Sequence, residues 1–196
     1  GGILWVATRR NPDRTRRWPR VWRAFGAGAL AFLISQVLTR IPLMTVVVPQ
    51  LPEPISGFLL SGPVASYTAG LFEETGRLVV MLLLLKAFHR WIDGVSFGLG
   101  HGGFEAALLV GMTTVNNLAL ASIINAGQWD AVAAALPPGQ AEQIHGALVD
   151  TPPVHFLLAG VERLSAMTLH IACSLLVLAG IVLGRKLVFW VAAVLL

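Results

Sequence analysis

Apolar residues occur along this chain in long runs and do not alternate with polar ones. Four runs reach the length of about 20 residues that a helix needs to cross a hydrocarbon core of about 30 Å. They cover residues 24–48, 63–88, 95–125 and 154–184, and shorter apolar stretches lie at both ends of the chain. The pattern predicts an all-α fold, a polytopic transmembrane helix bundle with four full spans and a truncated span at either end.

Composition supports a membrane-embedded chain. The 196 residues are 56% hydrophobic and 12% charged, and their mean hydropathy is +0.74, values that exclude an ordinary soluble domain. The chain opens on Gly-Gly and ends in KLVFWVAAVLL, a run too short to cross a bilayer. We therefore expect residues 1–196 to be a single transmembrane domain, a fragment of a longer chain. The single cysteine, Cys173, excludes an intramolecular disulfide and a cysteine-based metal site.

Basic residues alternate between the connections that separate the predicted spans. Residues 8–23 contain seven arginines, residues 86–94 contain Lys86 and Arg90, and residues 185–186 are Arg-Lys. The connection that contains PQLPEPIS, and residues 126–153, contain no Lys or Arg. By the positive-inside rule, the three basic connections are predicted to be cytoplasmic loops of a multi-pass protein of the cell membrane. The segment 126–153 is then an outer loop.

The first basic loop mixes arginine with tryptophan in RRNPDRTRRWPRVWR, a composition that also occurs in nucleic-acid-binding segments. Its position between two spans favours a topology signal that contacts lipid headgroups. We therefore expect the lipid bilayer as a partner and no nucleic acid.

The stretch LFEETGR places two carboxylates and a guanidinium inside the second predicted span. A charge near the bilayer centre costs roughly 3 kcal/mol or more, so intramembrane charges indicate function by default. Arg77 follows Glu73 by four residues and Glu74 by three, so it can pair with either on one helix face. It would hold one carboxylate charged and leave the other as a general base, and the spacing allows either assignment. A structural tie between helices is the alternative for an isolated Glu-Arg pair.

Two further spans also contain polar side chains. His101 and Glu105 are four residues apart in SFGLGHGGFEAALL, whose glycines allow close approach of another helix or a substrate. In VERLSAMTLHIACS, Arg163, His170 and Ser174 share one helix face. At about 1.5 Å per residue, the two histidines and the paired glutamates lie in overlapping middle layers of the membrane. The candidate catalytic residues are Glu73, Glu74, His101 and His170, and the candidate supporting residues are Arg77, Glu105, Glu162, Arg163 and Ser174.

The same cluster contains residue types that bind metal ions. His101, His170 and Glu73 could supply the two histidines and one carboxylate of a zinc site. The chain has no HExxH and no other metal-ligand motif of recognisable spacing. We therefore prefer a metal-free site without a cofactor and keep zinc as the alternative.

The stretches FEETGR, FGLGHGGFE and ERLSAMTLHIACS resemble, over roughly residues 60–185, the three signature stretches of the YhfC-type membrane peptidases. These are relatives of the CAAX-prenyl-protease and bacteriocin-processing (CPBP) glutamic intramembrane proteases, whose pattern is EExxxR, FxxxH and HxxxN or HxxxD. The resemblance implies that Glu73 and His101 activate a water and that His170 stabilises the oxyanion. The chain departs from the wider pattern at Arg77, which comes one residue early, and at Ser174, which replaces Asn or Asp.

The preferred hypothesis is a glutamic-type intramembrane endopeptidase that cuts a membrane protein or peptide within the bilayer. The alternative is a proton-coupled transporter or channel in which Glu73, Glu105 and His101 form a relay. The small number of spans and the lack of a recognisable inverted repeat argue against a transporter. A catalytically silent membrane scaffold is a third possibility.

Overall fold

The computed structural model describes residues 14–86 and 90–184. Every regular element within these ranges is helical, which confirms the predicted all-α class. The chain divides into two compact units. One contains the described residues up to Glu105 together with those from Ala166 onward, and the other is Ala106–Ser165.

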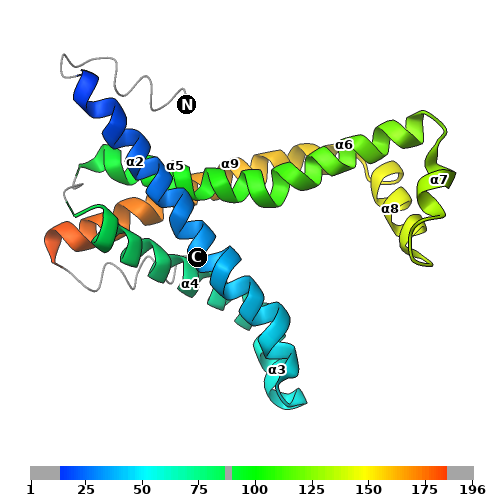
Figure 1. Cartoon of the computed structure of the whole chain (residues 1–196), viewed down its shortest axis with the longest axis horizontal. Coiled ribbons are helices and arrows are strands. Elements are labelled where there is room, and N and C mark those ends of the chain that lie inside the picture. The colour runs from blue at the N-terminus through cyan, green and yellow to red at the C-terminus, as the bar shows by residue number, and fades with distance from the viewer. Residues whose placement is uncertain (1–13, 87–89, 185–196) are drawn as a thin grey trace. The chain divides into compact units, whose positions relative to one another are not determined.

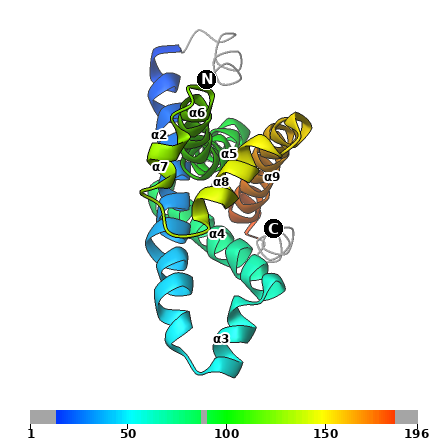
Figure 2. The same cartoon turned by 90° about the vertical axis from the view of Figure 1, so that its right-hand side faces the viewer.

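The first unit is a bundle of helices from both ends of the chain. In Figure 1, α2 lies across both α4 and α5, and it packs against each of them. Figure 2 shows the same helices turned by 90° about the vertical axis. The elements of this unit are α2 (Arg14–Phe32), the π-helical segments η1 (Leu33–Arg40) and η2 (Leu43–Val47), the 3-10 turn η3 (Val48–Gln50), α3 (Glu53–Leu60), α4 (Gly62–Leu84), α5 (Trp91–Glu105) and the latter part of α9 (Pro153–Leu183).

The second unit contains the predicted outer loop. Its elements are η4 (Ala106–Gly111), α6 (Met112–Asn125), α7 (Trp129–Ala133), α8 (Gln140–Val149) and the first part of α9. Gly139 precedes α8 with a φ of 80°, a left-handed conformation that glycine adopts without strain. The rings of Trp129 and His145, 5.5 Å apart between centroids, connect the two short helices of the loop.

The helices match the predicted spans closely. In the described part of the chain, three helical stretches are long and apolar enough to cross a membrane: Pro19–Gln50, Trp91–Asn125 and Pro153–Leu183. A fourth span results if α3 and α4, which meet at a bend of 66°, cross together. The protein is therefore a polytopic membrane protein. The truncated end spans lie outside the described residues, as does the predicted loop 185–186.

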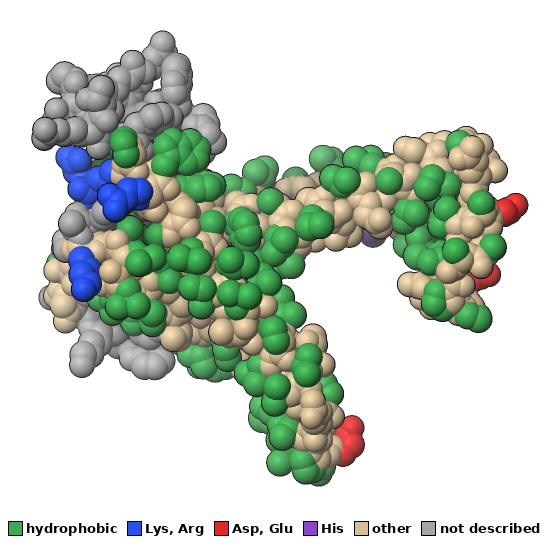
Figure 3. All heavy atoms as spheres, viewed as in Figure 1, with side chains coloured by type: hydrophobic (Ala, Val, Ile, Leu, Met, Phe, Trp, Pro, Cys, Tyr) green, Lys and Arg blue, Asp and Glu red, His purple; other side chains and the backbone are tan. Residues whose placement is uncertain are grey.

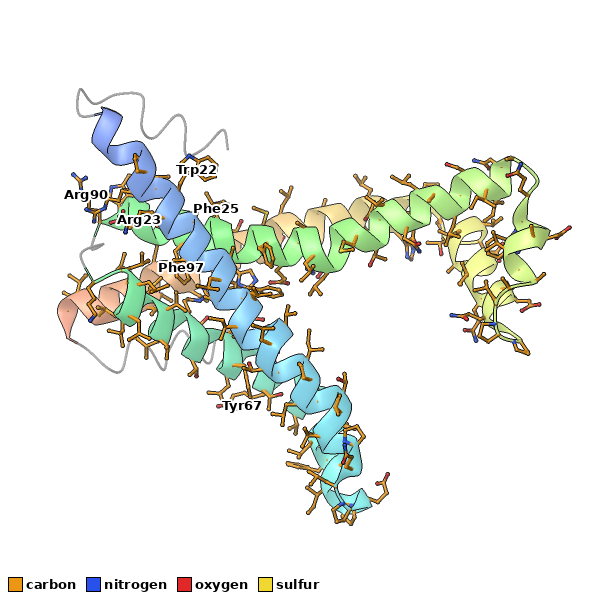
Figure 4. All side chains as sticks on the ribbon, in the orientation of Figure 1. Trp22, Arg23, Phe25, Tyr67, Arg90 and Phe97 are labelled. Carbon is orange, nitrogen blue, oxygen red and sulfur yellow. The ribbon has the colours of Figure 1, made fainter. Side chains whose placement is uncertain are left out.

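Part of the first basic connection is helical. Residues 8–13 are not described, and from Arg14 onward the chain is already part of α2. Pro19 does not prevent this helix. Figure 3 shows Lys and Arg side chains gathered at one end of the first unit, and Figure 4 labels Arg23 and Arg90 there. The acidic Glu53 lies on α3, on the far side of the long first span. That this basic end faces the cytoplasm stays a prediction of the positive-inside rule.

The second half of the first span is irregular, with π-helical segments on both sides of Pro42. Pro42 has no N–H to offer the carbonyl of Leu38, so one hydrogen bond of the helical ladder is missing there. The N–H of Ile41 bonds instead to the carbonyl of Gln36, five residues back. The hydroxyl of Thr39 also bonds to the carbonyl of Ser35, 2.6 Å away. The result is η1, and π-helical turns of this kind are frequent at functional sites.

Glycines bring the helix backbones of the first unit into direct contact. A Cβ on Gly28 of α2 would lie 2.0 Å from the carbonyl oxygen of Phe97, and one on Gly100 of α5 would lie 1.9 Å from that of Phe25. On another face of α5, a Cβ on Gly98 would lie 2.5 Å from the Cα of Ile171 in α9. The sequence singled out these α5 glycines as packing residues, and small residues at helix crossings have this role in membranes.

We predict that Gly28→Ala destabilises the bundle by about 1–3 kcal/mol or more, since the new methyl would overlap backbone atoms that cannot move independently. Gly26→Ala is the matched control on the same helix, because its Cβ would meet nothing within 4 Å. The midpoints of thermal unfolding in detergent measure both. Equal midpoints for the two variants would contradict the close crossing of α2 and α5.

Candidate functional site

Glu74 and Arg77 form an ion pair inside the bundle. Both side chains lie on α4 and both are fully buried, with Arg77 Nε 3.2 Å from Glu74 Oε1. The spacing of three residues places them on one helix face, as the sequence predicted. Of the two neighbouring glutamates, Glu74 is therefore the one that neutralises the arginine.

Arg77 also ties α4 to α9. Its NH1 group donates to the carbonyl oxygen of His170 (2.8 Å) and to Oγ of Ser174 (3.0 Å). Its NH2 group lies 3.2 Å from Nδ1 of His170. A guanidinium can only donate, so Nδ1 is the unprotonated ring nitrogen and the ring proton of His170 lies on Nε2. The arginine thereby fixes both the position and the tautomer of this histidine.

Glu73 faces the two histidines. Its Oε2 atom lies 3.4 Å from Nε2 of His101 and 3.8 Å from Nδ1 of His170. The two imidazole rings are 4.9 Å apart between centroids. One carboxylate from α4, one histidine from α5 and one from α9 therefore converge on a single point in the interior.

His101 is held by aromatic rings and not by hydrogen bonds. It is fully buried, with the ring of Phe32 edge-on at 5.5 Å and the ring of Phe97 stacked at 6.5 Å. Neither ring nitrogen has a hydrogen-bond partner within the described residues. A buried imidazole in this condition is costly, which points to a ligand or water that belongs there.

Glu105 completes the cluster at the end of α5. Its Oε2 atom lies 2.7 Å from Nε2 of His170, the nitrogen that carries the ring proton. His170 is thus placed between Arg77 on one ring nitrogen and Glu105 on the other. A carboxylate behind a histidine fixes the orientation of the ring and raises its basicity.

The structure brings together seven of the nine residues that the sequence singled out. They are Glu73, Glu74, Arg77, His101, Glu105, His170 and Ser174, all in the first unit. Glu162 and Arg163 lie in the second unit and form an ion pair with each other. Glu162 is exposed, and nothing in the geometry places this pair at the site.

Two further polar pairs were missed by sequence reasoning. Gln36 on η1 donates to Oε1 of Glu73, 2.7 Å away, and is itself contacted by Arg40. Arg20 on α2 forms a bidentate ion pair with the buried Asp93 at the start of α5. Its Nε donates to Oδ1 at 3.0 Å and its NH2 group to Oδ2 at 2.7 Å. Neither pair belongs to a recognisable motif. Asp93 also accepts from the backbone N–H of Arg90 and so caps α5.

A family model described as YhfC intramembrane metalloprotease matches residues 14–196. The chain belongs to this family. It is also 39% identical, over 132 residues, to the uncharacterized membrane protein YhfC of Bacillus subtilis (strain 168), a match that covers 65% of this chain. The chain spans about half the length of that relative. No solved structure matches the chain.

The family description implies a metal ion, and the donor atoms of the site are of the right kind and spacing. One atom each from Glu73, His101 and His170 lie within 4.8 Å of one another. Tetrahedral zinc with bonds of about 2.0–2.1 Å separates its ligand atoms by about 3.3 Å. The separations of 3.4 and 3.8 Å from Glu73 Oε2 are close to that value. The nitrogens of His101, which have no hydrogen-bond partner within the described residues, fit the same role. Nδ1 of His170 accepts from Arg77 in this structure, so it would exchange that hydrogen bond for the metal.

We predict that Arg77→Met costs about 3–5 kcal/mol of stability, because it leaves the buried carboxylate of Glu74 unpaired. Adding Glu74→Gln removes that charge and should recover part of the loss. Unfolding in denaturant, with the protein in detergent micelles, measures both variants.

The control for this prediction is Glu162→Gln, which breaks an exposed ion pair and should change stability by no more than about 1 kcal/mol. A double variant no more stable than Arg77→Met alone would show that the Glu74 charge is not what Arg77 neutralises.

Proposed function

We propose that this protein is an intramembrane endopeptidase that hydrolyses a peptide bond of a membrane protein or peptide substrate. The observation that carries the proposal is the convergence of Glu73, His101 and His170 from three different helices on one buried point. Three polar groups in an apolar bundle are costly, and packing alone does not require them. Membership of a family described as intramembrane metalloproteases supports the same class of reaction.

We further propose that Glu73, His101 and His170 hold a zinc ion. When bound, zinc supplies a water that ionises near neutral pH and an electrophile for the scissile carbonyl. The chain contributes the orientation of its ligands. Glu105 faces Nε2 of His170 and fixes the ring, and Nδ1, which accepts from Arg77 in this structure, would exchange that hydrogen bond for the metal. Phe32 and Phe97 hold the ring of His101 in place.

A metal-free version of the reaction uses the same atoms and remains a distinct proposal. In it, Oε2 of Glu73 accepts a proton from a water that His101 orients, and His170 donates toward the developing oxyanion. The likeness to the glutamic CPBP proteases supports this version. The two versions differ in one measurable respect, the dependence of cleavage on bound metal.

The surroundings of the site favour a substrate that lies in the membrane. Within the first unit, much of the surface of α4 and of the latter part of α9 is apolar and exposed, including Leu82, Leu83, Leu169 and Val182. A segment that reaches Glu73 must therefore pass through a hydrocarbon-facing surface or enter from a membrane boundary. The cytoplasmic side of the protein is, in this proposal, the end of the bundle that carries Arg23 and Arg90.

The test is cleavage of a membrane-peptide library by the purified full-length protein, with zinc content measured on the same samples. Glu73→Gln and His101→Ala are each expected to lower kcat by at least about a thousandfold, since they remove groups that act on the reacting water. Both should also lower the zinc content of the protein. Chelation should abolish cleavage, and added zinc should restore it.

Glu162→Gln and His155→Ala are the matched controls, because each makes the same chemical change at an exposed position of the second unit. Cleavage that resists chelation but requires Glu73 would support the metal-free version. Equal cleavage by wild type, Glu73→Gln and His101→Ala would end the protease proposal. Proton or solute flux that depends on Glu73, in vesicles without cleavage, would favour a transporter.

A further inference from the structure

Gln36 lies almost fully buried on η1, opposite the helix that carries the paired glutamates. One hydrogen of its side-chain amide is donated to Oε1 of Glu73 at 2.7 Å, and the other to the carbonyl oxygen of Ala69 at 3.2 Å. Both N–H groups of the amide are thereby satisfied. Glu73 and Ala69 are one helical turn apart, so a single amide spans a turn of α4.

The orientation of this amide follows from its third contact. NH1 of Arg40 donates to the amide oxygen of Gln36 at 3.3 Å. A guanidinium has no acceptor, so the amide oxygen must face Arg40 and the NH2 group must face Glu73. In the reverse orientation the amide oxygen would face a carboxylate and a carbonyl oxygen, and the amide N–H groups would face the guanidinium. Three unfavourable contacts would then replace three favourable ones.

Arg40 is itself anchored on α4. Its NH2 group donates to the carbonyl oxygen of Ala65 at 2.5 Å. Arg40 and Gln36 therefore bond to successive turns of α4 at Ala65, Ala69 and Glu73. The π-helical geometry of η1 presents both side chains to α4 along this line.

We propose that Gln36 is a positioning residue of the site, one that divides the two oxygens of Glu73 between separate tasks. This inference rests on the proposed function. The amide holds Oε1, so that Oε2 is directed to His101 and His170. Arg40 does not contact Glu73 in this arrangement; it acts indirectly, because its hydrogen bond to the amide oxygen of Gln36 fixes the orientation of that amide. Without the amide, the carboxylate is free to rotate, and either oxygen can point away from the histidines.

The test compares Gln36→Leu and Gln36→Glu in the full-length protein with Gln50→Leu as a matched control. Gln36→Glu keeps the size of the side chain and removes the donor. Gln50 lies on the same span, is exposed, and bonds only to the carbonyl of Val46 among the contacts described. Arg40→Met is the milder variant, since it leaves the amide in place and removes only what orients it.

Two readouts are used. The first is the carboxylate stretching band of Glu73 in isotope-edited infrared spectra, assigned by its loss in Glu73→Gln. We expect this band to shift in both Gln36 variants, to shift less in Arg40→Met and to stay unchanged in Gln50→Leu. The second is the dissociation constant for zinc together with kcat and KM for a cleaved peptide. Loss of a partner that orients a metal ligand typically costs 10–100-fold, and we expect a loss of about this size in zinc affinity and kcat with KM largely unchanged.

The readouts separate this inference from the proposed function. An unshifted Glu73 band with wild-type zinc affinity and kcat in Gln36→Leu would overturn the role of Gln36 and leave the protease proposal standing. Wild-type protein that neither binds zinc nor cleaves peptides would end the proposed function, and the infrared band would still decide whether Gln36 holds Glu73. Equal effects of Gln36→Leu and Gln50→Leu on every readout would also overturn the positioning role.

Discussion

Arg77 has no exposed surface, and a charged side chain buried in an apolar bundle is stable only where the protein supplies an opposite charge and hydrogen-bond acceptors. Glu74 supplies the opposite charge, and His170 and Ser174 of α9 supply the acceptors. These contacts fix the distance and rotation of α9 relative to α4. The position of His170, and hence the geometry of the whole cluster, depends on this one guanidinium. Lysine would not serve, because it lacks the planar fork that reaches several acceptors at once.

Close backbone contact makes the cluster compact. The side chains of Glu73, His101 and His170 come from three helices and can meet only if those helices approach more closely than large side chains allow. Gly98 and Gly102 provide this on α5, where a Cβ would meet the backbone at Ile171 or the ring of His170. Gly28 and Gly100 do the same where α5 crosses α2. The glycines thus have a packing role, and the packing in turn sets the distances within the site.

Much of this arrangement follows from the sequence, and the rest depends on tertiary contacts that no local pattern encodes. The spans, the glycine contacts and the convergence of Glu73, His101 and His170 follow from hydrophobic run length, helical spacing and estimated depth. The spacing of Arg77 from Glu73 and Glu74 allowed either pair, and only the orientation of α4 toward α9 selects Glu74. Gln36 was not predicted because its spacing of four residues from Arg40 belongs to no recognised motif, and its contact with Glu73 depends on how two helices pack. Arg163 was included because it shares a helix face with His170, and in the structure it pairs with Glu162 within the second unit.

Two arginines determine which neighbouring groups donate and which accept hydrogen bonds on either side of Glu73, because a guanidinium can only donate. On one side, Arg40 turns the amide of Gln36 so that its N–H groups face the carboxylate. On the other side, Arg77 keeps Nδ1 of His170 unprotonated and leaves the ring proton facing Glu105. Oε2 of Glu73 is thereby left to face the two histidines, while the lone pair of Nδ1 of His170 already accepts from Arg77. A carboxylate oxygen placed in this way attracts a cation or the hydrogens of a water, and it repels a second acceptor. Arg40 and Arg77 therefore decide which side-chain atoms near Glu73 donate hydrogen bonds and which accept them. This restricts the ligands of the site more than the residue types alone would.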